Sequence, residues 1–583
     1  MTSPKHTITF VHAPDIRYDQ NYGTYFIPLW AYTLASHVPD TWEVVVHDCK
    51  VDTLDAIQPS DVFAFSGINQ DIDSIRRVHD QIKAKCPKAV FLLGGPITWS
   101  LQQEGKLHFL DYFDYLFILD GEETLPMFLK AFEEQRHGQL PRLIEADRFP
   151  VGKARKIRFD LLRPKASHYY GAVIEVSRGC PFLCEFCDIR VLPGNNRSNT
   201  KSPTLIVEEL DEFHRLGVTQ IQFACDNFIG NVAEARECVD AVLAWKERTG
   251  AQVSIFTWLT INLYKMPDLM AKMRQAGFSI LFIGIESVNQ HSLLETAKVQ
   301  NIKSLREAVE TIQSHGFIIA PGFIFGFDSD TNTIFDDTLT FIREVGLLGG
   351  DPSFLTALSG TPLYKRMQQT GRLVERQDDV TARAKIATNI RYLQDTEFLK
   401  NGFLRFMHIY TSPAFQYARF KRHMELLLHS EQFVESDGVG YGSPIEYLKL
   451  QFRDSMNRRM LFLRLAYLMR KPSTFWAVLK AWILLKRFSR QYRGLNIHFN
   501  YWVYVWTNIG LKYWGLTKAD FSIHTVGPDF DLAALLDGLS SDTKQDKETL
   551  LRGDEKADTQ ARYTNQALKR LVEEKQNTTK TSS

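Results

Sequence analysis

The stretch that decides the fold of this chain is Ser177-Arg178-Gly179-Cys180-Pro181-Phe182-Leu183-Cys184-Glu185-Phe186-Cys187-Asp188. It follows an apolar run that is typical of a β-strand, and its cysteines have the spacing C-x3-C-x2-C. One short loop with this spacing can place three thiolates around a single iron–sulfur cube. Because such clusters are usually held by four cysteines, three ligands leave one iron open for another molecule. We therefore predict a 4Fe–4S site at Cys180, Cys184 and Cys187.

A zinc site or a disulfide framework accounts less well for these cysteines. A structural zinc site would need a fourth ligand nearby, and Asp188 is the only adjacent candidate. A disulfide framework is typical of small secreted chains, whereas this chain has 583 residues. Seven cysteines, three of them in one loop, instead indicate a reducing cytosol. The iron–sulfur site is the interpretation that we keep.

The opening Gly-Cys-Pro of this stretch and Phe186 before the third cysteine resemble the cysteine motif of the radical SAM family. The resemblance implies that the open iron binds the amino and carboxylate groups of S-adenosylmethionine (SAM). It also implies that Phe186 lies at the cofactor site. An electron donor such as a ferredoxin or flavodoxin would then reduce the cluster.

Residues 1–145 alternate strand-like and helix-like stretches, which is typical of an α/β domain with a parallel sheet. We expect strands at 7–11, 42–47, 62–66, 89–93 and 115–119, and helices at 26–37 and 72–85. Ligands of such sheets bind at the carboxyl ends of the strands. The candidate contacts at these ends are Pro14, Ser66, Gly67, Gly94, Gly95, Gly121 and Glu122.

The layout of this first domain resembles the cobalamin-binding domain that precedes many radical SAM cores. The matching segments follow the third, fourth and fifth strands: Ser66-Gly67, Gly94-Gly95-Pro96 and Gly121-Glu122. The resemblance implies a Rossmann-like domain that binds cobalamin through the candidate contacts. The D-x-H-x-x-G motif that supplies a histidine to the cobalt in other proteins is absent, so no such ligand is expected. A domain that keeps the fold without the cofactor is the alternative.

Residues 146–169 contain interspersed prolines and arginines and are expected to form a linker. From 170 to 375 the chain alternates again, with strands expected near 171–177, 218–223, 252–257, 279–284, 317–325 and 352–357. Six βα units fit the partial (β/α)6 barrel that the family resemblance implies. The site of such a barrel lies at the C-terminal ends of its strands.

Several strand ends of this core resemble the SAM-binding segments of the family. The candidate contacts are Asp226, Asn227, Thr260, Asn262, Gly284, Glu286, Gly322 and Gly326. The chain departs from related sequences at Cys225 and Trp258, where acidic residues are common. We expect Cys225 to be a small buried residue. For Glu286, a carboxylate near the start of a helix is the alternative to a SAM contact.

Residues 376–538 are expected to form a helical domain rich in basic and aromatic side chains. Between Asp454 and Asp520 the chain has no acidic residue, while basic, aromatic and leucine residues alternate. This composition is typical of helices that lie on an anionic membrane surface. An ordinary helix pair with a basic outer face is the alternative, and no nucleic-acid module is recognisable. The polar tail at 539–583 is predicted to be disordered, with a short helix at 567–574.

Composition adds few constraints. Lys and Arg number 69 against 68 Asp and Glu, so the overall charge does not indicate a nucleic-acid partner. The N-terminus shows no cleavable apolar segment, and no apolar run reaches the roughly 18 residues of a membrane span. We expect a cytoplasmic protein, or one that is peripheral on the inner face of the membrane.

From residue 7 to about 375 the resemblances occur in one order. This order is similar to that of the cobalamin-binding radical SAM methylases of class B type, the family that includes the hopanoid C-2 methylase. The resemblance implies that a 5′-deoxyadenosyl radical takes a hydrogen atom from an unactivated carbon, which then receives a methyl group from methylcobalamin. A second SAM would remethylate the cobalamin. We therefore expect a C-methyltransferase for a hydrophobic, lipid-like substrate.

The sequence leaves three further functions open. A radical SAM cyclase or oxidoreductase resembling the anaerobic magnesium-protoporphyrin ester cyclase would use the same cofactors. A tRNA methylthiotransferase usually carries a further cysteine trio upstream, whereas only Cys49 and Cys86 precede the core here. A lipid-surface protein with an inactive core would not need the three cysteines of the loop.

Overall fold

The computed structural model describes residues 6–15, 26–298, 305–374, 385–435, 452, 455–488, 494–527 and 530. The predicted tail at 539–583, with its short helix, lies outside the described residues. The chain divides into two compact units. The first comprises Met1–Gly179, Arg197–Thr257 and Tyr441–Leu461, and the second comprises Cys180–Asn196, Trp258–Gly440 and Phe462–Ser583.

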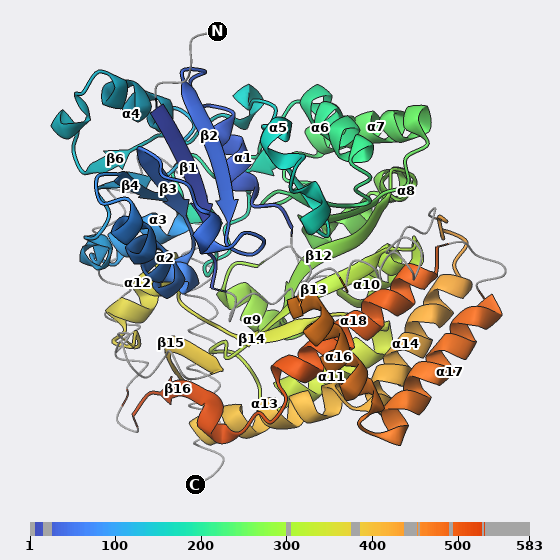
Figure 1. Cartoon of the computed structure of the whole chain (residues 1–583). Helices are drawn as coiled ribbons and strands as arrows, with labels where there is room; N and C mark the ends of the chain where they lie inside the picture. The colour runs from blue at the N-terminus through green and yellow to red at the C-terminus, as the bar shows by residue number, and fades with distance from the viewer. Residues whose placement is uncertain are drawn as a thin grey trace. The chain divides into compact units, whose positions relative to one another are not determined.

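The first unit opens with a parallel sheet in the strand order β2-β1-β3-β4-β5-β6 (Figure 1). Its strands are β1 (His6–His12), β2 (Trp42–Asp48), β3 (Val62–Ser66), β4 (Val90–Gly94), β5 (Tyr115–Ile118) and β6 (Leu143–Glu145). The helices are α1 (Leu29–Ala35), α2 (Ile72–Lys85), α3 (Pro96–Gln103) and α4 (Thr124–Glu133). The predicted strands β1 to β5 are confirmed. Strand β6 is not among them, because three residues carry too little periodicity.

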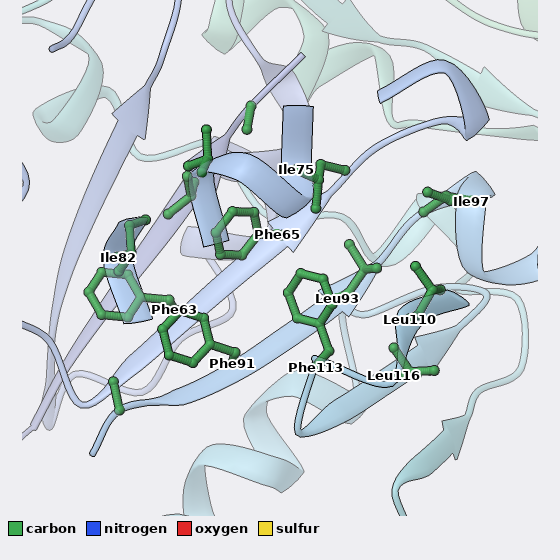
Figure 2. Packing of buried hydrophobic residues seen from close by; sticks show 14 of the residues in the cluster. Phe63, Phe65, Ile75, Ile82, Phe91, Leu93, Ile97, Leu110, Phe113 and Leu116 are labelled. Carbon is green, nitrogen blue, oxygen red and sulfur yellow. The ribbon is translucent and has the colours of Figure 1, made fainter. Parts of the chain in front are cut away.

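A hydrophobic core lies between this sheet and helices α2 and α3 (Figure 2). Alternate residues of β3 and β4 belong to it: Phe63, Phe65, Phe91 and Leu93. Phe63 stacks on Phe91 with ring centroids 5.4 Å apart. The intervening residues of both strands are mostly buried as well, as expected for a parallel sheet that is covered on both faces. This packing fixes the strand ends at which the sequence predicts ligand contacts.

The predicted core strands form a second sheet in the order β14-β13-β12-β11-β10-β7. They are β7 (Ala172–Glu175), β10 (Gln220–Ala224), β11 (Ser254–Leu259), β12 (Phe278–Glu286), β13 (Ile318–Phe325) and β14 (Asp351–Phe354). Pairing is parallel for β7 with β10, β10 with β11, β12 with β13 and β13 with β14. Each strand overlaps its predicted range, so the predicted core strands are confirmed.

Helices alternate with these strands, as a partial (β/α)6 barrel requires. They are α6 (Pro203–Arg215), α7 (Val232–Thr249), α8 (Pro267–Gln275), α9 (Gln290–Glu295), α10 (Leu305–Ser314), α11 (Ile334–Val345) and α12 (Pro362–Gln369). The segment predicted to be a linker contains a short helix, α5 (Phe159–Leu162).

After α12 the described residues are mainly helical, as predicted. Its helices are α13 (Thr396–Tyr410), α14 (Pro413–Leu428), α16 (Ser455–Met469), α17 (Pro472–Phe488) and α18 (Asn496–Lys512). Helix α14 packs along α17 (Figure 1). The prediction that strands end near residue 375 is wrong, because β15 (Ile386–Tyr392) and β16 (Phe521–Thr525) pair in parallel. These strands lie far apart in the chain, so no local pattern connects them.

Two tryptophans of α18 organise the core of these helices. Trp502 and Trp506 are at most 1% exposed and lie among apolar side chains of α14 and α17. Their indole N–H groups donate to Gln416 Oε1 and to the carbonyl oxygen of Thr411, both at 2.9 Å. A buried indole needs such an acceptor, so these contacts fix where α18 lies against α14.

Candidate active site

The cysteine loop, residues 180–196, is enclosed by a short antiparallel ladder of β8 (Ser177–Arg178) and β9 (Asn199–Thr200). Backbone hydrogen bonds within the loop shape it further. The N–H of Cys180 donates to the Asn195 carbonyl oxygen at 2.9 Å, and that of Cys187 donates to the Cys184 carbonyl oxygen at 3.2 Å. Backbone hydrogen bonds of the protein itself therefore close the loop.

The thiols of the loop have the chemistry that an iron–sulfur cluster requires. Cys184 is buried, and Cys180 and Cys187 are half-buried. Burial, followed by the neighbouring Cys184 and Asp188, raises the pKa of Cys187 to about 12, so a thiolate at this position needs a cation beside it. In the described residues, no three His, Cys, Asp or Glu side chains are grouped to hold one metal ion. A 4Fe–4S cube does not need three side chains on one metal ion, because each cysteine thiolate binds a different iron of the cube. The donor set fits a 4Fe–4S cluster.

A buried ion pair lies beside the cysteine loop. Lys298 Nζ donates to Glu286 Oε1 at 2.9 Å and lies 5.9 Å from the ring centroid of Phe186. Burial alone would lower the pKa of Lys298, but the Glu286 carboxylate and the Cys184 thiol nearby raise it. The structure thus brings the predicted residues Phe186 and Glu286 together with the loop. Lys298, which connects them, is not among the predicted residues.

The backbone around Glu286 makes room for this ion pair. Strand β12 has an irregularity between Gly284 and Glu286, and Glu286 has a φ of 64°, in the left-handed region. A Cβ at Gly284 would collide with the Glu286 carboxylate, and a Cβ at Gly322 would contact it at 3.5 Å. Backbone strain of this kind persists where the surroundings impose it, often at functional sites. Gly284 is therefore required by the position of the Glu286 carboxylate, whereas a Cβ at Gly322 would make only an ordinary contact with it.

Asp226 and Asn227 follow strand β10. Asp226 Oδ2 accepts the backbone N–H of Gly179 at 2.5 Å, and Gly179 has a φ of 97°. This bond fixes the residue directly before Cys180, so Asp226 shapes the start of the cysteine loop. Asn227 is 1% exposed.

Thr260, Asn262 and Gly326 lie at other strand ends. The Thr260 hydroxyl is buried and has no hydrogen-bond partner among the described residues, which leaves an acceptor and donor for a ligand. Asn262 is half-buried on the short 3-10 helix Ile261–Lys265. At Gly326, with a φ of 92°, a Cβ would lie 2.6 Å from the Tyr392 ring. Gly326 is thus required by the packing of Tyr392.

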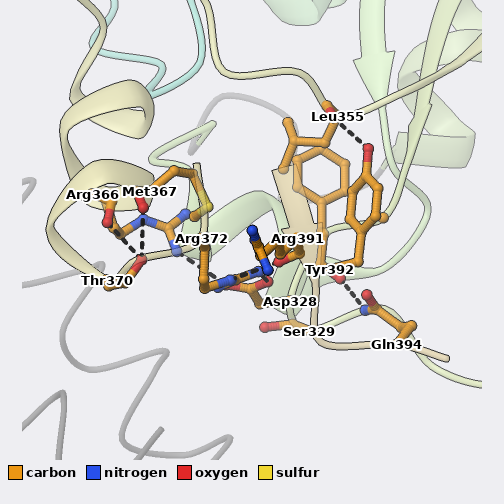
Figure 3. Close-up of polar contacts among 12 residues, drawn as sticks. Asp328, Ser329, Leu355, Arg366, Met367, Thr370, Arg372, Arg391, Tyr392 and Gln394 are labelled. Atoms are coloured by element: carbon orange, nitrogen blue, oxygen red, sulfur yellow. Dashed lines mark hydrogen bonds and ion pairs between the residues drawn. The ribbon is translucent and has the colours of Figure 1, made fainter. Parts of the chain in front are cut away.

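A cluster of buried charges holds the segment between Cys184 and Cys187. We call it the buried arginine network; its residues are Glu185, Asp328, Arg366 and Arg372, all at most 8% exposed. Arg366 of α12 donates to both carboxylate oxygens of Glu185, at 2.8 and 2.9 Å, and to Asp328 at 3.0 Å. Arg372 donates two bonds of 2.7 and 2.6 Å to the same Asp328 (Figure 3). Paired guanidinium–carboxylate bonds fix geometry as well as charge.

A third carboxyl group lies beside this network. Glu295 lies 3.6 Å from Arg366, and burial, followed by Asp328, raises the pKa of Glu295. Burial would also raise the pKa of Asp328, but Arg372 and Arg366 lower it. Both carboxyl oxygens of Glu295 also accept backbone N–H groups, from Asp328 at 3.1 Å and from Ser329 at 2.9 Å. Sequence reasoning missed these residues, since nothing in their local patterns marks them as partners.

In the first unit, the loops after β3 and β4 meet. Gly95 has a φ of 87°, and a Cβ there would collide with the Ser66 hydroxyl and lie 3.1 Å from the Gly67 carbonyl oxygen. Only glycine fits both the backbone and the space. At Gly94, a Cβ would make an ordinary contact of 3.5 Å with Phe117. The structure thus gathers four of the predicted contacts at one edge of the sheet.

The loop after β1 joins this edge through Asp71, which sequence reasoning missed. The Asp71 carboxylate accepts the N–H of Asp15 at 2.9 Å and that of Ile68 at 3.0 Å. The carbonyl oxygen of Pro14 accepts the Ser74 hydroxyl at 3.2 Å. Pro14 is therefore held near the start of α2.

Gly121 and Glu122 follow β5. The Gly121 carbonyl oxygen accepts the N–H of Leu125 in the first turn of α4. Glu122 Oε1 accepts a bond from Arg178 Nη2 at 2.6 Å, and Arg178 also pairs with Asp120 at 2.9 Å and with Glu175 at 2.7 Å. Burial raises the pKa of Glu122 although Arg178 opposes it. Glu122 thus holds the arginine that precedes the cysteine loop.

Two family models match the chain. The model of the radical SAM superfamily matches residues 174–342, which include the cysteines and the strand ends of the core. A domain of unknown function, DUF4070, matches residues 361–505. The chain is a radical SAM enzyme. Enzymes of this class hold a 4Fe–4S cluster and bind SAM.

Curated relatives define its family more closely. The hopanoid C-2 methylase of Rhodopseudomonas palustris is 31% identical over 376 residues, which are 63% of this chain and 68% of that protein. An uncharacterized methyltransferase of Synechocystis is 32% identical over 354 residues, which are 60% of this chain and 64% of that protein. The chain belongs to the radical SAM family that includes the hopanoid C-2 methylase.

A solved structure confirms the fold. The cobalamin-dependent S-adenosylmethionine radical enzyme OxsB, with aqua-cobalamin and S-adenosylmethionine bound, aligns with a TM-score of 0.56 at 15% identity. The alignment covers 97% of this chain and 84% of that one. The predicted fold class, an α/β domain followed by a partial barrel and helices, is therefore confirmed.

Proposed function

We propose that the chain is a cobalamin-dependent radical SAM C-methyltransferase that acts on an unactivated carbon of a hydrophobic, lipid-like substrate. The observation that carries the proposal is the cysteine loop, held by the buried arginine network and lying beside Glu286 and Lys298. The 31% identity to the hopanoid C-2 methylase supports methylation and the substrate class. Likeness in fold to a cobalamin-binding enzyme supports the second cofactor.

Each part of the site in the second unit has a proposed task. Cys180, Cys184 and Cys187 hold the cluster. Glu286 offers a carboxylate that can accept a hydrogen bond from an amine or hydroxyl of SAM. Lys298 holds this carboxylate in position and offsets the negative charge of the nearby thiolates. When bound, the cluster and SAM supply a carbon-centred radical and cobalamin supplies the methyl group.

For cobalamin we propose the loops after β3 and β4 in the first unit. Ser66, Gly67, Gly94 and Gly95 present backbone and one hydroxyl with no bulky side chain, which allows a large ring to approach closely. Glu122 has a different task in this proposal. Because its carboxylate is bonded to Arg178, it acts as a positioning residue for the cysteine loop.

The first test is the cofactor content of the protein purified anaerobically with cobalamin supplied. We expect about one 4Fe–4S cluster and about one corrinoid per chain, as one three-cysteine loop implies for the cluster. Cys184→Ala should lose iron and sulfide, whereas the control Cys86→Ala, outside the site, should keep both. A full content of iron and sulfide without corrinoid would exclude methyl transfer through cobalt.

The second test identifies the reaction. With SAM, a reductant and a lipid extract, a methyltransferase of this kind produces S-adenosylhomocysteine beside 5′-deoxyadenosine. We expect both products together with a methylated lipid. A cyclisation, the alternative that the sequence leaves open, would produce 5′-deoxyadenosine without S-adenosylhomocysteine. That second outcome would refute methylation and keep the radical SAM chemistry.

A further inference from the structure

The outer side of α17 is apolar where a helix packed on a core is expected to be polar. The helix buries Ala477, Ala481 and Leu485 among the C-terminal helices. Away from this stripe it carries large apolar side chains that are between 45% and 56% exposed: Phe475, Trp476, Trp482 and Ile483. A helix on the surface of a soluble domain usually places charged and polar residues there.

Exposed apolar side chains are concentrated in this part of the protein. Of the fourteen large apolar residues that are exposed in the described ranges, nine lie between Phe462 and Trp514. Single exposed apolar residues are normal on protein surfaces, but a group of them marks a contact site. The same segment also holds the buried Trp502 and Trp506, so aromatic residues here serve two separate purposes.

Basic side chains accompany the apolar ones. Lys480, Lys486 and Arg487 are exposed on α17, and Arg470 and Lys471 come shortly before it. The Lys486 ammonium lies 5.8 Å from the ring centroid of Trp482, so charged and aromatic groups are intermixed. We use the name aromatic–basic face for these residues of α17: Phe475, Trp476, Lys480, Trp482, Ile483, Lys486 and Arg487.

This mixture of groups fits the surface of a bilayer that carries anionic lipids. Tryptophan prefers the headgroup region, aliphatic side chains enter the acyl boundary, and each nearby Lys or Arg strengthens binding roughly fivefold. The centre of a protein interface is instead depleted in lysine, and an aliphatic residue such as Ile483 offers nothing for a nucleic-acid base to stack on. Between Asp454 and Asp520, no acidic residue opposes an anionic surface.

We propose that the aromatic–basic face docks the protein on a bilayer surface that carries anionic lipids. In the described part of the chain, no helix has the length and apolar character needed to cross a membrane. The proposal depends on the exposure and charge of α17 and is independent of the reaction. Docking would bring the enzyme to the bilayer, in which a lipid-like substrate dissolves.

The test is co-sedimentation of the full-length protein with vesicles of phosphatidylcholine, alone or with roughly 30% phosphatidylglycerol as the anionic lipid. At low salt we expect binding to the anionic vesicles and little binding to phosphatidylcholine alone. Because salt screens the attraction, binding should weaken at least about tenfold at about 0.5 M salt. Absence of binding at low salt, or binding that does not depend on phosphatidylglycerol, would overturn the proposal.

Variants separate the charged and apolar contributions. The triple variant Lys480→Gln, Lys486→Gln, Arg487→Gln should weaken binding roughly 100-fold. The double variant Trp476→Ser, Ile483→Ser should weaken it roughly tenfold. The matched control is Met127→Ser with Lys88→Gln, which removes an exposed apolar and an exposed basic side chain from the first unit.

The control variant should bind like the wild type. Equal binding by the control and by the variants of α17 would refute the proposal. The oligomeric state without lipid is the other measurement. If the protein dimerises in solution and the Trp476→Ser, Ile483→Ser variant does not, the aromatic–basic face contacts a second copy and the proposal is wrong.

Discussion

The buried arginine network and the aromatic–basic face, both in the second unit, reverse the usual distribution of residues in opposite ways. The network places Arg366 and Arg372 in the interior, at most 8% exposed, whereas the face leaves Trp476 and Ile483 more than half exposed. In the network the charges meet partners from within the unit, Glu185 and Asp328. The comparison teaches that the buried charges serve the fold and the cysteine loop, whereas the exposed side chains are available for the bilayer contact that we propose.

The energetic consequences of the two regions differ accordingly. Removing one partner of a buried ion pair leaves the other charge in a medium of low dielectric constant, which is costly. Replacing an exposed side chain usually changes stability little. Substitutions should therefore destabilise the fold in the network and alter only binding in the aromatic–basic face.

The largest effect is expected for Arg366→Met. Without the guanidinium, Glu185 loses its bidentate partner and Asp328 loses one of two, so the free energy of unfolding should fall by about 3–5 kcal/mol. Urea unfolding followed by circular dichroism measures this change. The control Lys365→Met lies at an exposed position of the same helix and should shift it by less than about 0.5 kcal/mol. Similar changes in the free energy of unfolding for both variants would mean that Arg366 stabilises the fold no more than an exposed lysine does.

Acidification should destabilise the fold through the buried contact between His423 and His498, which is uncharged. His423 Nε2 lies 2.9 Å from His498 Nδ1, and burial lowers the pKa of His423 from 6.5 to about 3. Burial, followed by His423 and Arg274, also lowers the pKa of His498. Below about pH 6.5 the unfolded chain therefore binds protons that the folded chain excludes, and stability falls as the pH falls.

At about pH 4.5 this exclusion should cost roughly 2–3 kcal/mol for His423 alone. Urea unfolding of the wild type and of His423→Gln at neutral and acidic pH measures it, and the variant should lack this part of the loss. His429→Gln, which removes the histidine at the C-cap of α14, should retain this loss. An unchanged pH dependence in His423→Gln would disprove the assignment.

A smaller effect is expected for Arg372→Lys. The ammonium keeps the charge but cannot reproduce the two bonds to Asp328 or the bond from Nε to the Arg391 carbonyl oxygen. The loss should be about 1–2 kcal/mol, the cost of a buried acceptor left unpaired. The measurement is again urea unfolding, and Arg372→Met should lose more than Arg372→Lys. The reverse order would show that charge is unimportant there.

The smallest effect on folding is expected for Trp476→Gln. The side chain is 56% exposed, so the free energy of unfolding should change by less than about 0.5 kcal/mol. The buried Trp506, whose indole donates to Thr411, provides the contrast, and Trp506→Gln should destabilise by about 3 kcal/mol or more. Thermal unfolding of both variants tests the difference. Comparable losses would show that the outer side of α17 is part of the core.

By itself, the sequence determined most elements of the fold and the cysteine loop. Strand and helix patterns are local, since they reflect the burial of residues two to four positions apart. The spacing of Cys180, Cys184 and Cys187 and the G-x-E segment ending at Glu286 are local as well. These features could therefore be predicted, and the basic and aromatic composition of the C-terminal helices could be seen, although not which side chains face outward.

Only the tertiary structure decided which distant residues complete the site. Arg366 lies 181 positions from Glu185, and nothing in either local segment indicates that they meet. The same holds for Lys298 beside the cysteine loop and for the pairing of β15 with β16. The physical reason is that a buried charge is tolerated only where the fold supplies its partner. Which residue becomes that partner depends on how separate helices and strands pack, and so does the exposure of Trp476.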